Sequence, residues 1–125
     1  EAVGWSAAFE WMSAIDLPAH HERLLNIAKW TAEQLRKLGF TVYGRHQSGD
    51  AAVVSFLHPI IHSEDFARFL DAKGFAVRTG HHCAQPLLNR LGISGTIRAS
   101  FYLYNTRQEA EKFIETVRYI VEKFA

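Results

Sequence analysis

The stretch Thr96-Ile97-Arg98-Ala99-Ser100-Phe101-Tyr102 alternates polar with apolar side chains. Successive side chains of an extended chain point to opposite faces, so the two kinds separate. The polar face carries Thr96, Arg98 and Ser100, and the apolar face carries Ile97, Ala99 and Phe101. The stretch therefore predicts a strand over residues 96–102, with one face on a core and the other open to contacts.

Short β-rich segments predict three more strands, over residues 41–43, 51–57 and 75–79. The second of these is almost wholly apolar and follows the turn-forming residues Ser48-Gly49-Asp50. This pattern is typical of a well-buried strand.

Apolar residues at helical spacing predict helices over residues 3–15 and 19–38, and a shorter one over 84–91. Ser63 precedes two acidic residues, so we expect it to cap a helix that ends before Gly74.

The last helix has the clearest start signal. Thr106 and Glu109 form a capping-box pattern, and apolar residues then keep helical spacing as far as Phe124. Helices and short strands in this mixture indicate the α+β class, with helices packed on a small and largely antiparallel sheet.

The length and charge of the chain bound its function. A chain of 125 residues with 48% hydrophobic content suits one domain with its own core. Fourteen basic and thirteen acidic residues give a net charge of +1. The sequence contains no basic cluster, so we expect neither nucleic acid nor a membrane surface as a partner. We expect neither a signal peptide nor a membrane span, because the start Glu1-Ala2 is acidic and no apolar run approaches about eighteen residues. A single cysteine favours a reducing compartment, the cytoplasm or the interior of an organelle.

That cysteine, Cys83, lies in the run Arg78-Thr79-Gly80-His81-His82-Cys83-Ala84. Two imidazoles, a guanidinium and the predicted start of a helix can all favour the thiolate, which is the reactive form of a thiol. The alternative is a buried structural cysteine, the commoner fate of an isolated one. The polar, turn-forming neighbours favour a reactive thiol.

Arg98 is the second candidate, because it interrupts a strand whose other face is apolar. A guanidinium can hold a carboxylate through two parallel hydrogen bonds, which fix both its position and its orientation. The alternative is that Arg98 faces solvent on the open side of the sheet.

A metal site is not expected at the histidines of this run. His81, His82 and Cys83 are consecutive, so their side chains diverge and cannot all reach one tetrahedral ion. A cysteine protease remains a distant alternative, because it needs a base that faces the thiol across a site. The remaining histidines are expected at the surface or as helix caps: His20, His21, His46, His58 and His62.

The run around Cys83, followed by Arg98-Ala99-Ser100 and Tyr104-Asn105-Thr106, resembles the C-terminal segment of cysteine desulfurases of the sulfur-mobilisation (group II) type, whose members include selenocysteine lyases. The resemblance extends over the whole chain. It implies the small C-terminal domain of the fold-type I, class-V aminotransferase architecture. Residues 1–17 would then end a connecting helix from a missing large domain, and residues 18–125 would form the small domain with the active-site cysteine loop.

The resemblance also implies a reaction. Cys83 would be the nucleophile that takes sulfur from L-cysteine as a persulfide and releases L-alanine, and L-selenocysteine is a possible substrate. Arg98 would clamp the substrate carboxylate, and Arg78 would also bind the substrate and lie in the active-site loop. The rest of the active-site loop would consist of Thr79, Gly80, His81 and His82.

Cofactor and partners follow in the same way. The family uses pyridoxal phosphate, works as a homodimer, and passes sulfur to an acceptor protein for iron–sulfur clusters or other uses. In the family, the cofactor lysine lies on the large domain, and none of the five lysines here matches it. This chain alone is therefore expected to hold half a site and to be inactive.

Two other interpretations stay open. The chain could be a stand-alone module that accepts persulfide from another protein at Cys83. It could also have a purely structural role, in which its aromatic-rich helices pack on a partner.

Overall fold

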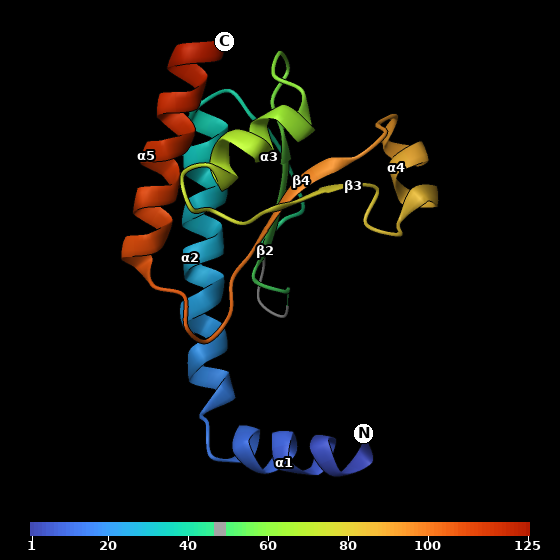
Figure 1. Cartoon of the computed structure of the whole chain (residues 1–125), viewed down its shortest axis with the longest axis vertical. Coiled ribbons are helices and arrows are strands. Elements are labelled where there is room, and N and C mark those ends of the chain that lie inside the picture. Colours follow the sequence, from blue (N-terminus) through green and yellow to red (C-terminus); the bar gives the residue numbers. More distant parts are fainter. Residues whose placement is uncertain (47–49) are drawn as a thin grey trace.

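The computed structural model describes residues 1–46 and 50–125. In chain order its elements are α1 (Ala2–Ser13), α2 (Leu17–Lys37), β1 (Thr41–Tyr43), β2 (Val53–Leu57), α3 (Ser63–Asp71), β3 (Arg78–Gly80), α4 (Gln85–Leu91), β4 (Thr96–Ser100) and α5 (Arg107–Phe124) (Figure 1). No helix in this described part of the chain is both long and apolar enough to cross a bilayer.

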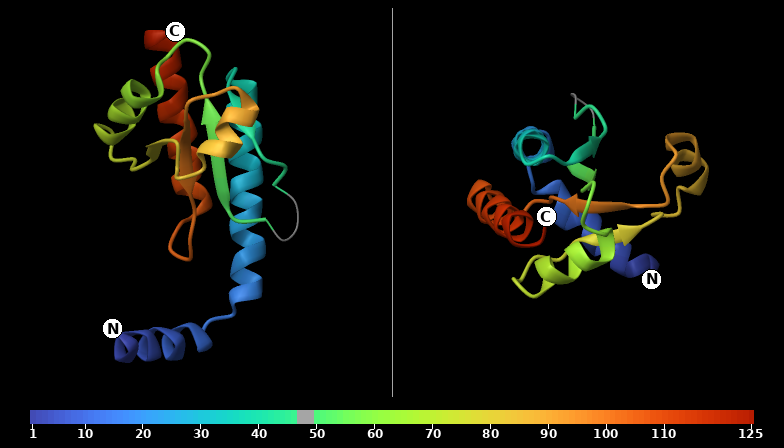
Figure 2. Two further views of the ribbon diagram at one scale, coloured as in Figure 1. Left: turned by 90° about the vertical axis from the view of Figure 1, so that its right-hand side faces the viewer. Right: turned by 90° about the horizontal axis from the view of Figure 1, so that it is seen from above.

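The sheet has the strand order β1-β2-β4-β3, and every neighbouring pair is antiparallel. Helices α2, α3 and α5 gather on one side of it, whereas α4 projects beyond the ends of β3 and β4 (Figures 1 and 2). The result is one layer of helices on one small antiparallel sheet. The predicted α+β class is confirmed.

The core lies between these two layers. Along β2 and β4, alternate residues are buried and face the helices, such as Val54 opposite Ala99 and Phe56 opposite Ile97. Helices and loops complete the core with fully or almost fully buried side chains: Leu24, Ala28, Leu35, Phe40, Phe66, Leu70, Phe113, Val117 and Ile120. Burial of this apolar surface is the main term that stabilises the fold.

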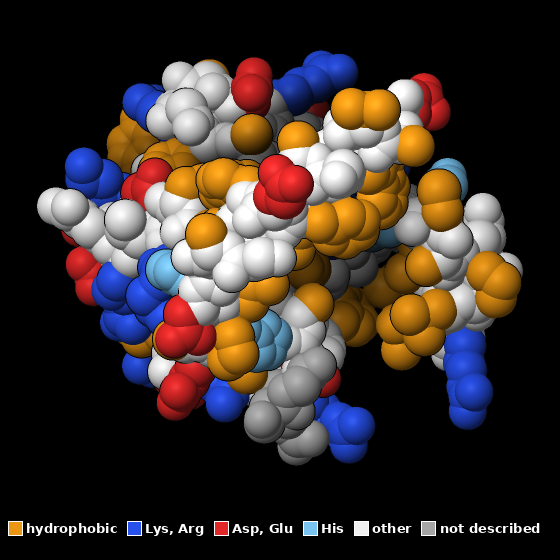
Figure 3. Space-filling model, turned by 90° about the horizontal axis from the view of Figure 1, so that it is seen from below, with side chains coloured by type: hydrophobic (Ala, Val, Ile, Leu, Met, Phe, Trp, Pro, Cys, Tyr) orange, Lys and Arg blue, Asp and Glu red, His pale blue; other side chains and the backbone are white. Residues whose placement is uncertain are grey.

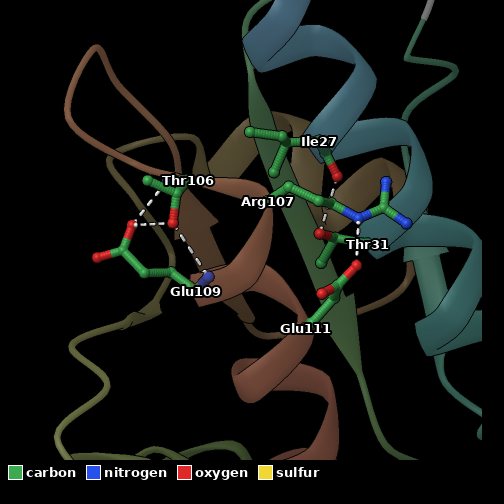
Figure 4. Close-up of polar contacts among 6 residues, drawn as sticks. All are labelled: Ile27, Thr31, Thr106, Arg107, Glu109 and Glu111. Carbon is green, nitrogen blue, oxygen red and sulfur yellow. Dashed lines mark hydrogen bonds and ion pairs between the residues drawn. The ribbon is translucent and has the colours of Figure 1, made fainter.

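Polar contacts fix where two helices begin. The Asp16 side chain accepts the amide of Ala19 at 3.2 Å at the start of α2. At α5, Thr106 Oγ1 accepts the Glu109 amide at 3.2 Å, and Glu109 Oε2 accepts the Thr106 amide at 2.7 Å, as Figure 4 shows. The predicted capping box is present.

A guanidinium ties the loop before α5 to α2. Arg23 donates to the backbone oxygens of Leu103 and Asn105, at 2.9 and 2.6 Å. Asn105 Oδ1 accepts the Tyr102 amide within the same loop, at 2.8 Å. These bonds fix the path by which β4 leads into α5.

Several predicted boundaries were wrong. The long strands are shorter, and residues 75–77 are not in β3. The ring of Phe75 packs on Phe113 of α5, with centroids 5.6 Å apart, so the chain first follows the helical layer and joins β4 only at Arg78. Ser48 and Gly49, which belong to the predicted turn, lie outside the described residues.

Two expectations about polar residues also need correction. The cap of α3 is His62 rather than Ser63, and its Nδ1 accepts the Glu64 amide at 3.4 Å. His46 is buried rather than at the surface, and its Nε2 lies 3.1 Å from the backbone oxygen of Val53.

Helix α1 differs from the other long helices because none of its residues is buried. It lies across one end of α2, away from the sheet (Figure 1). Figure 3, viewed from this end, shows hydrophobic side chains gathered over it. Its large exposed apolar residues are Val3, Trp5, Phe9 and Trp11.

The capping box gives a stability prediction. Thr106→Ala removes the acceptor of the Glu109 amide, so the free energy of unfolding should fall by about 1 kcal/mol in urea denaturation. Thr116→Ala is the matched control. The Thr116 hydroxyl only bonds to the Lys112 carbonyl within the same helix, and alanine is the better helix former, so this variant should not be destabilised. Equal losses in the two variants would contradict the role of the cap.

Candidate functional site

The face of the sheet away from the helices carries a polar row that crosses all four strands. Tyr43 pairs with Ser55, Ser55 with Arg98, and Arg98 with Arg78. Directly paired residues of antiparallel strands have their side chains on the same face. Ile97 and Ala99, which flank Arg98 in β4, face the core, so this row lies on the uncovered face.

The two arginines make this row a candidate anion site. Like charges directly opposite each other on paired strands are unfavourable. Among the described residues, neither Arg78 nor Arg98 forms an ion pair, and Arg98 Nε is buried without a hydrogen-bond partner. A carboxylate would supply both the missing acceptor and the missing negative charge.

The cysteine loop leaves the sheet at the end of β3 through Gly80, whose φ is 110°. His82 and Cys83 then both adopt left-handed backbone angles, with φ of 53° and 57°. This conformation costs a non-glycine residue about 1–2 kcal/mol. The Cys83 amide donates to His81 Nδ1 at 3.0 Å, and the Ala84 amide donates to the His81 carbonyl at 2.8 Å. The loop is thus a tight, hydrogen-bonded turn.

Cys83 is exposed at the tip of this turn, and α4 begins two residues later. The interpretation as a buried core cysteine is therefore wrong. An exposed thiol can meet a substrate or another protein directly.

His82 connects the loop to the central strand. Its Nε2 lies 3.0 Å from both the backbone oxygen and the hydroxyl of Thr96, which is 3% exposed. Thr96 precedes Arg98 by two residues on the same face, a separation of about 7 Å along a strand. The loop is anchored close to the candidate anion site.

The surroundings lower the pKa of His82. Burial is the largest cause, and the positive charges of Arg98, Arg78 and His81 act in the same direction, whereas the bond to the Thr96 backbone opposes them. His82 is therefore neutral at physiological pH.

Gly80 and Gly95 lie where the loop leaves β3 and re-enters the sheet at β4, and their backbones are close together. A Cβ at Gly95 would lie 2.9 Å from both the carbonyl carbon and the oxygen of Gly80. Only a residue without a side chain fits at this position, just before β4 begins.

The structure brings three of the predicted site residues together at β4, leaves His81 and Cys83 exposed in the turn, and places Thr79 on the other face. Arg78 and Arg98 are directly paired, and His82 is tied to the same strand. Thr79 pairs with Ile97 and so shares the opposite face of the sheet. No three His, Cys, Asp or Glu side chains gather as a metal site would need, within residues 1–46 and 50–125.

Sequence reasoning missed Tyr43, Ser55 and Gly95. Ser55 is the single hydroxyl within the apolar run of β2, which was a usable signal. Tyr43 joins the row only through the register of β1 on β2, which no local pattern reveals.

Comparison with known proteins places the chain in a family. The profile of the family described as aminotransferase class-V matches residues 1–113. The chain belongs to the class-V aminotransferase family.

Its relatives within this class-V family include proteins named probable cysteine desulfurase from Staphylococcus epidermidis and Staphylococcus aureus, each 35% identical over 126 aligned residues. The alignment covers all of this chain but 30% of each relative. The chain thus spans about a third of the length of the curated relatives that it matches.

Solved structures agree with this class-V assignment. The apo structure of cysteine desulfurase from Thermococcus onnurineus NA1 superposes with a TM-score of 0.92 at 37% identity, covering 98% of this chain and 31% of that one. The cysteine desulfurase CsdA (S-sulfonic acid) from Escherichia coli superposes with a TM-score of 0.89 at 32% identity, covering 98% and 30%.

The close approach of Gly95 to Gly80 gives a second prediction. Gly95→Ala forces the two backbones apart, so we expect a loss of about 1–3 kcal/mol of stability and faster amide hydrogen exchange over residues 78–84. The neighbouring exposed Ser94 provides the control, since Ser94→Ala adds no atom at the contact. Unchanged exchange in Gly95→Ala would show that the backbones are not in contact.

Proposed function

We propose that this chain is the C-terminal part of a pyridoxal-phosphate-dependent cysteine desulfurase of the sulfur-mobilisation type. Residues 18–125 would be the small domain that carries the cysteine loop, and residues 1–17 would end the segment that connects it to the large domain. The observation that carries the proposal is that an exposed, single cysteine lies in a loop that its neighbour His82 anchors to the strand bearing Arg98. The names of the relatives support the same activity.

Arg98 would bind the carboxylate of the substrate, L-cysteine. Its buried and unpartnered Nε needs an acceptor, and Arg78 adds a second positive charge from the paired strand. A carboxylate held at this row would be oriented with respect to the loop, because β3 carries Arg78 and leads directly into the loop. Orientation of this kind is a large part of catalysis between two reactants.

Cys83 would be the sulfur acceptor. Its Sγ would form a bond to the substrate sulfur while the bond between that sulfur and the substrate Cβ breaks. The Cys83 thiol and L-cysteine would become a persulfide and L-alanine, so atoms and electrons balance without an external oxidant. L-selenocysteine offers the same carboxylate and a weaker carbon–chalcogen bond, so selenocysteine lyase activity is part of this proposal.

The residues of this chain fit the substrate and not the attachment of the cofactor. All five lysines lie in, or just after, helices of the layer behind the sheet: Lys29, Lys37, Lys73, Lys112 and Lys123. None of them is on the uncovered face with Arg98. Pyridoxal phosphate supplies the electron withdrawal that such chemistry needs. Its lysine would belong to the large domain, and this chain by itself would be inactive.

The remaining roles are proposals of the same kind. Gly80, His81 and His82 would shape the cysteine loop together with Thr79 at its base. The exposed Cys83 would transfer the outer sulfur of its persulfide to an acceptor protein, for iron–sulfur clusters or other uses. The full-length protein would be a homodimer in the cytoplasm or an organelle.

A second candidate function is a stand-alone module that accepts persulfide, which the exposure of Cys83 also suits. The two candidates differ in what generates the persulfide. A coding region that continues upstream into a domain with the cofactor lysine would remove the need for the second candidate.

The nucleophile can be tested in the full-length enzyme. Cys83→Ala should lower alanine release from L-cysteine by on the order of 100-fold or more, because no thiol remains to accept the sulfur. Cofactor absorbance should be unchanged. Mass spectrometry should find one added sulfur atom on the Cys83 peptide of the unchanged protein only. Asn89→Ala, an exposed change on α4, is the control and should keep the rate. Full activity in Cys83→Ala would refute the assignment.

The carboxylate clamp can be tested separately. Arg98→Lys keeps the charge but loses the paired hydrogen bonds, so KM for L-cysteine should rise by about 10- to 100-fold. The exposed Arg118 on α5 is the control, and Arg118→Lys should have an unchanged KM. A KM that stays the same in Arg98→Lys would mean that the substrate carboxylate binds elsewhere.

A further inference from the structure

We infer that His82 is a positioning residue, which holds the neighbouring Cys83 at a fixed place relative to Arg98 by binding the backbone oxygen and hydroxyl of Thr96. This inference rests on the proposed desulfurase function. It adds Thr96 to the site. It also assigns different roles to His81, which shapes the turn, and His82, which fixes the position of the turn on the sheet.

The contacts of His81 stay within the turn. Its ring accepts the Cys83 amide, and its carbonyl accepts the Ala84 amide, so His81 shapes the turn without fixing its location. The ring of His82 reaches a residue fourteen positions away. Among the described residues, these two contacts of His82 are the side-chain hydrogen bonds that join residues 81–84 to the sheet.

The geometry at Thr96 sets the protonation of the ring. A backbone oxygen can only accept, so His82 Nε2 must carry the hydrogen that lies toward Thr96. Nδ1 is then the unprotonated nitrogen of the neutral ring. It is buried and has no partner in the described part of the chain. A proton added there would be a buried and unbonded donor near two guanidinium groups, which is unfavourable.

The strained backbone explains why such a tether is needed. His82 and Cys83 both hold left-handed angles, which non-glycine residues leave unless other contacts keep them there. The hydrogen bonds of His82 act on the first of the two strained residues, and its neighbour bears the thiol. Loss of the tether would let the thiol move relative to a carboxylate held at Arg98, and a misplacement of about 1 Å costs roughly 100-fold in rate.

The first experiment compares three variants of the full-length enzyme. His82→Ala removes the tether, and His82→Gln restores a donor near the position of Nε2. His21→Ala, at an exposed position on α2, is the matched control. The single-turnover rate of persulfide formation on Cys83 should fall about 10- to 100-fold in His82→Ala. KM for L-cysteine should change less than twofold, because Arg98 is untouched. His82→Gln should recover most of the rate, and the control should equal the unchanged protein.

A second readout does not depend on activity. Amide hydrogen exchange of the peptide containing residues 81–84 should be about tenfold faster in His82→Ala, since local opening no longer breaks the bond to Thr96. It should be close to normal in His82→Gln. Thr96→Val keeps the backbone acceptor and loses the hydroxyl. Its exchange rate over residues 81–84 should therefore lie between those of His82→Ala and His82→Gln.

The pH dependence gives an independent check. The charged or titratable groups that act on His82 are Arg98 on β4, Arg78 on β3 and His81 in the loop, and Cys83 is its neighbour in the chain. Protonation at Nδ1 would leave the Nε2 donor in place but would add a charge and an unpartnered buried donor near Arg78 and Arg98. Because the pKa of folded His82 is lowered, the docked position of the ring is fully favoured above pH 6.5 and loses stability as the pH falls through that lowered pKa. The ratio of the unchanged protein's rate to that of His82→Gln should therefore fall on acidification.

Two results would overturn the inference. One is a normal persulfide rate with normal exchange in His82→Ala. The other is a His82→Gln variant as impaired as His82→Ala in both readouts. If Cys83→Ala retains full activity, the proposed function fails instead, whereas the exchange experiment still reports on the tether.

Discussion

The pairing of β4 on both of its edges is the constraint on which the rest of the structure depends. β2 and β3 both pair with this strand and fix its register. Its alternate side chains therefore point either into the core or onto the uncovered face of the sheet. Ile97 and Ala99 enter the core, and Thr96 and Arg98 reach the uncovered face. A shift of one residue in this register would place Arg98 in the core and expose the apolar residues. The fold and the candidate site are therefore fixed by the same hydrogen bonds.

Local sequence signals predicted much of this arrangement. The alternation around Arg98 predicted the central strand, and Thr106 with Glu109 predicted the start of α5. Both signals depend on residues close together in the chain. The departure of residues 75–77 from β3 depends on a ring contact with α5, which is distant in sequence. Local patterns carry no such information.

The same distinction applies to the candidate site. Cys83 and Arg98 stand out by residue type, so the sequence was enough to select them. The partners that give them a location do not stand out, since Thr96 and Ser55 are ordinary strand residues. Their significance comes from register and from contact between segments. Thr79 shows the opposite case, because it lies in the distinctive run but on the other face of the sheet.

The pairing of Arg78 with Arg98 also shows that the net charge of a chain does not indicate the local charge of a site. The chain is almost neutral overall, yet two guanidinium groups share one face without an acidic partner among the described residues. A small anion that approaches this face meets a local positive field.

Gly80 pairs with Thr96, so the chain leaves the sheet and re-enters it at one point. Residues 81–95 form a closed excursion whose two ends are neighbours. Substitutions or length changes in its outer part, around α4, can accumulate in natural variants with little effect on the helical layer. Changes within residues 81–95 would alter which molecules can contact the Cys83 thiol. The contacts between the helical layer and the sheet, which stabilise the domain, would stay the same.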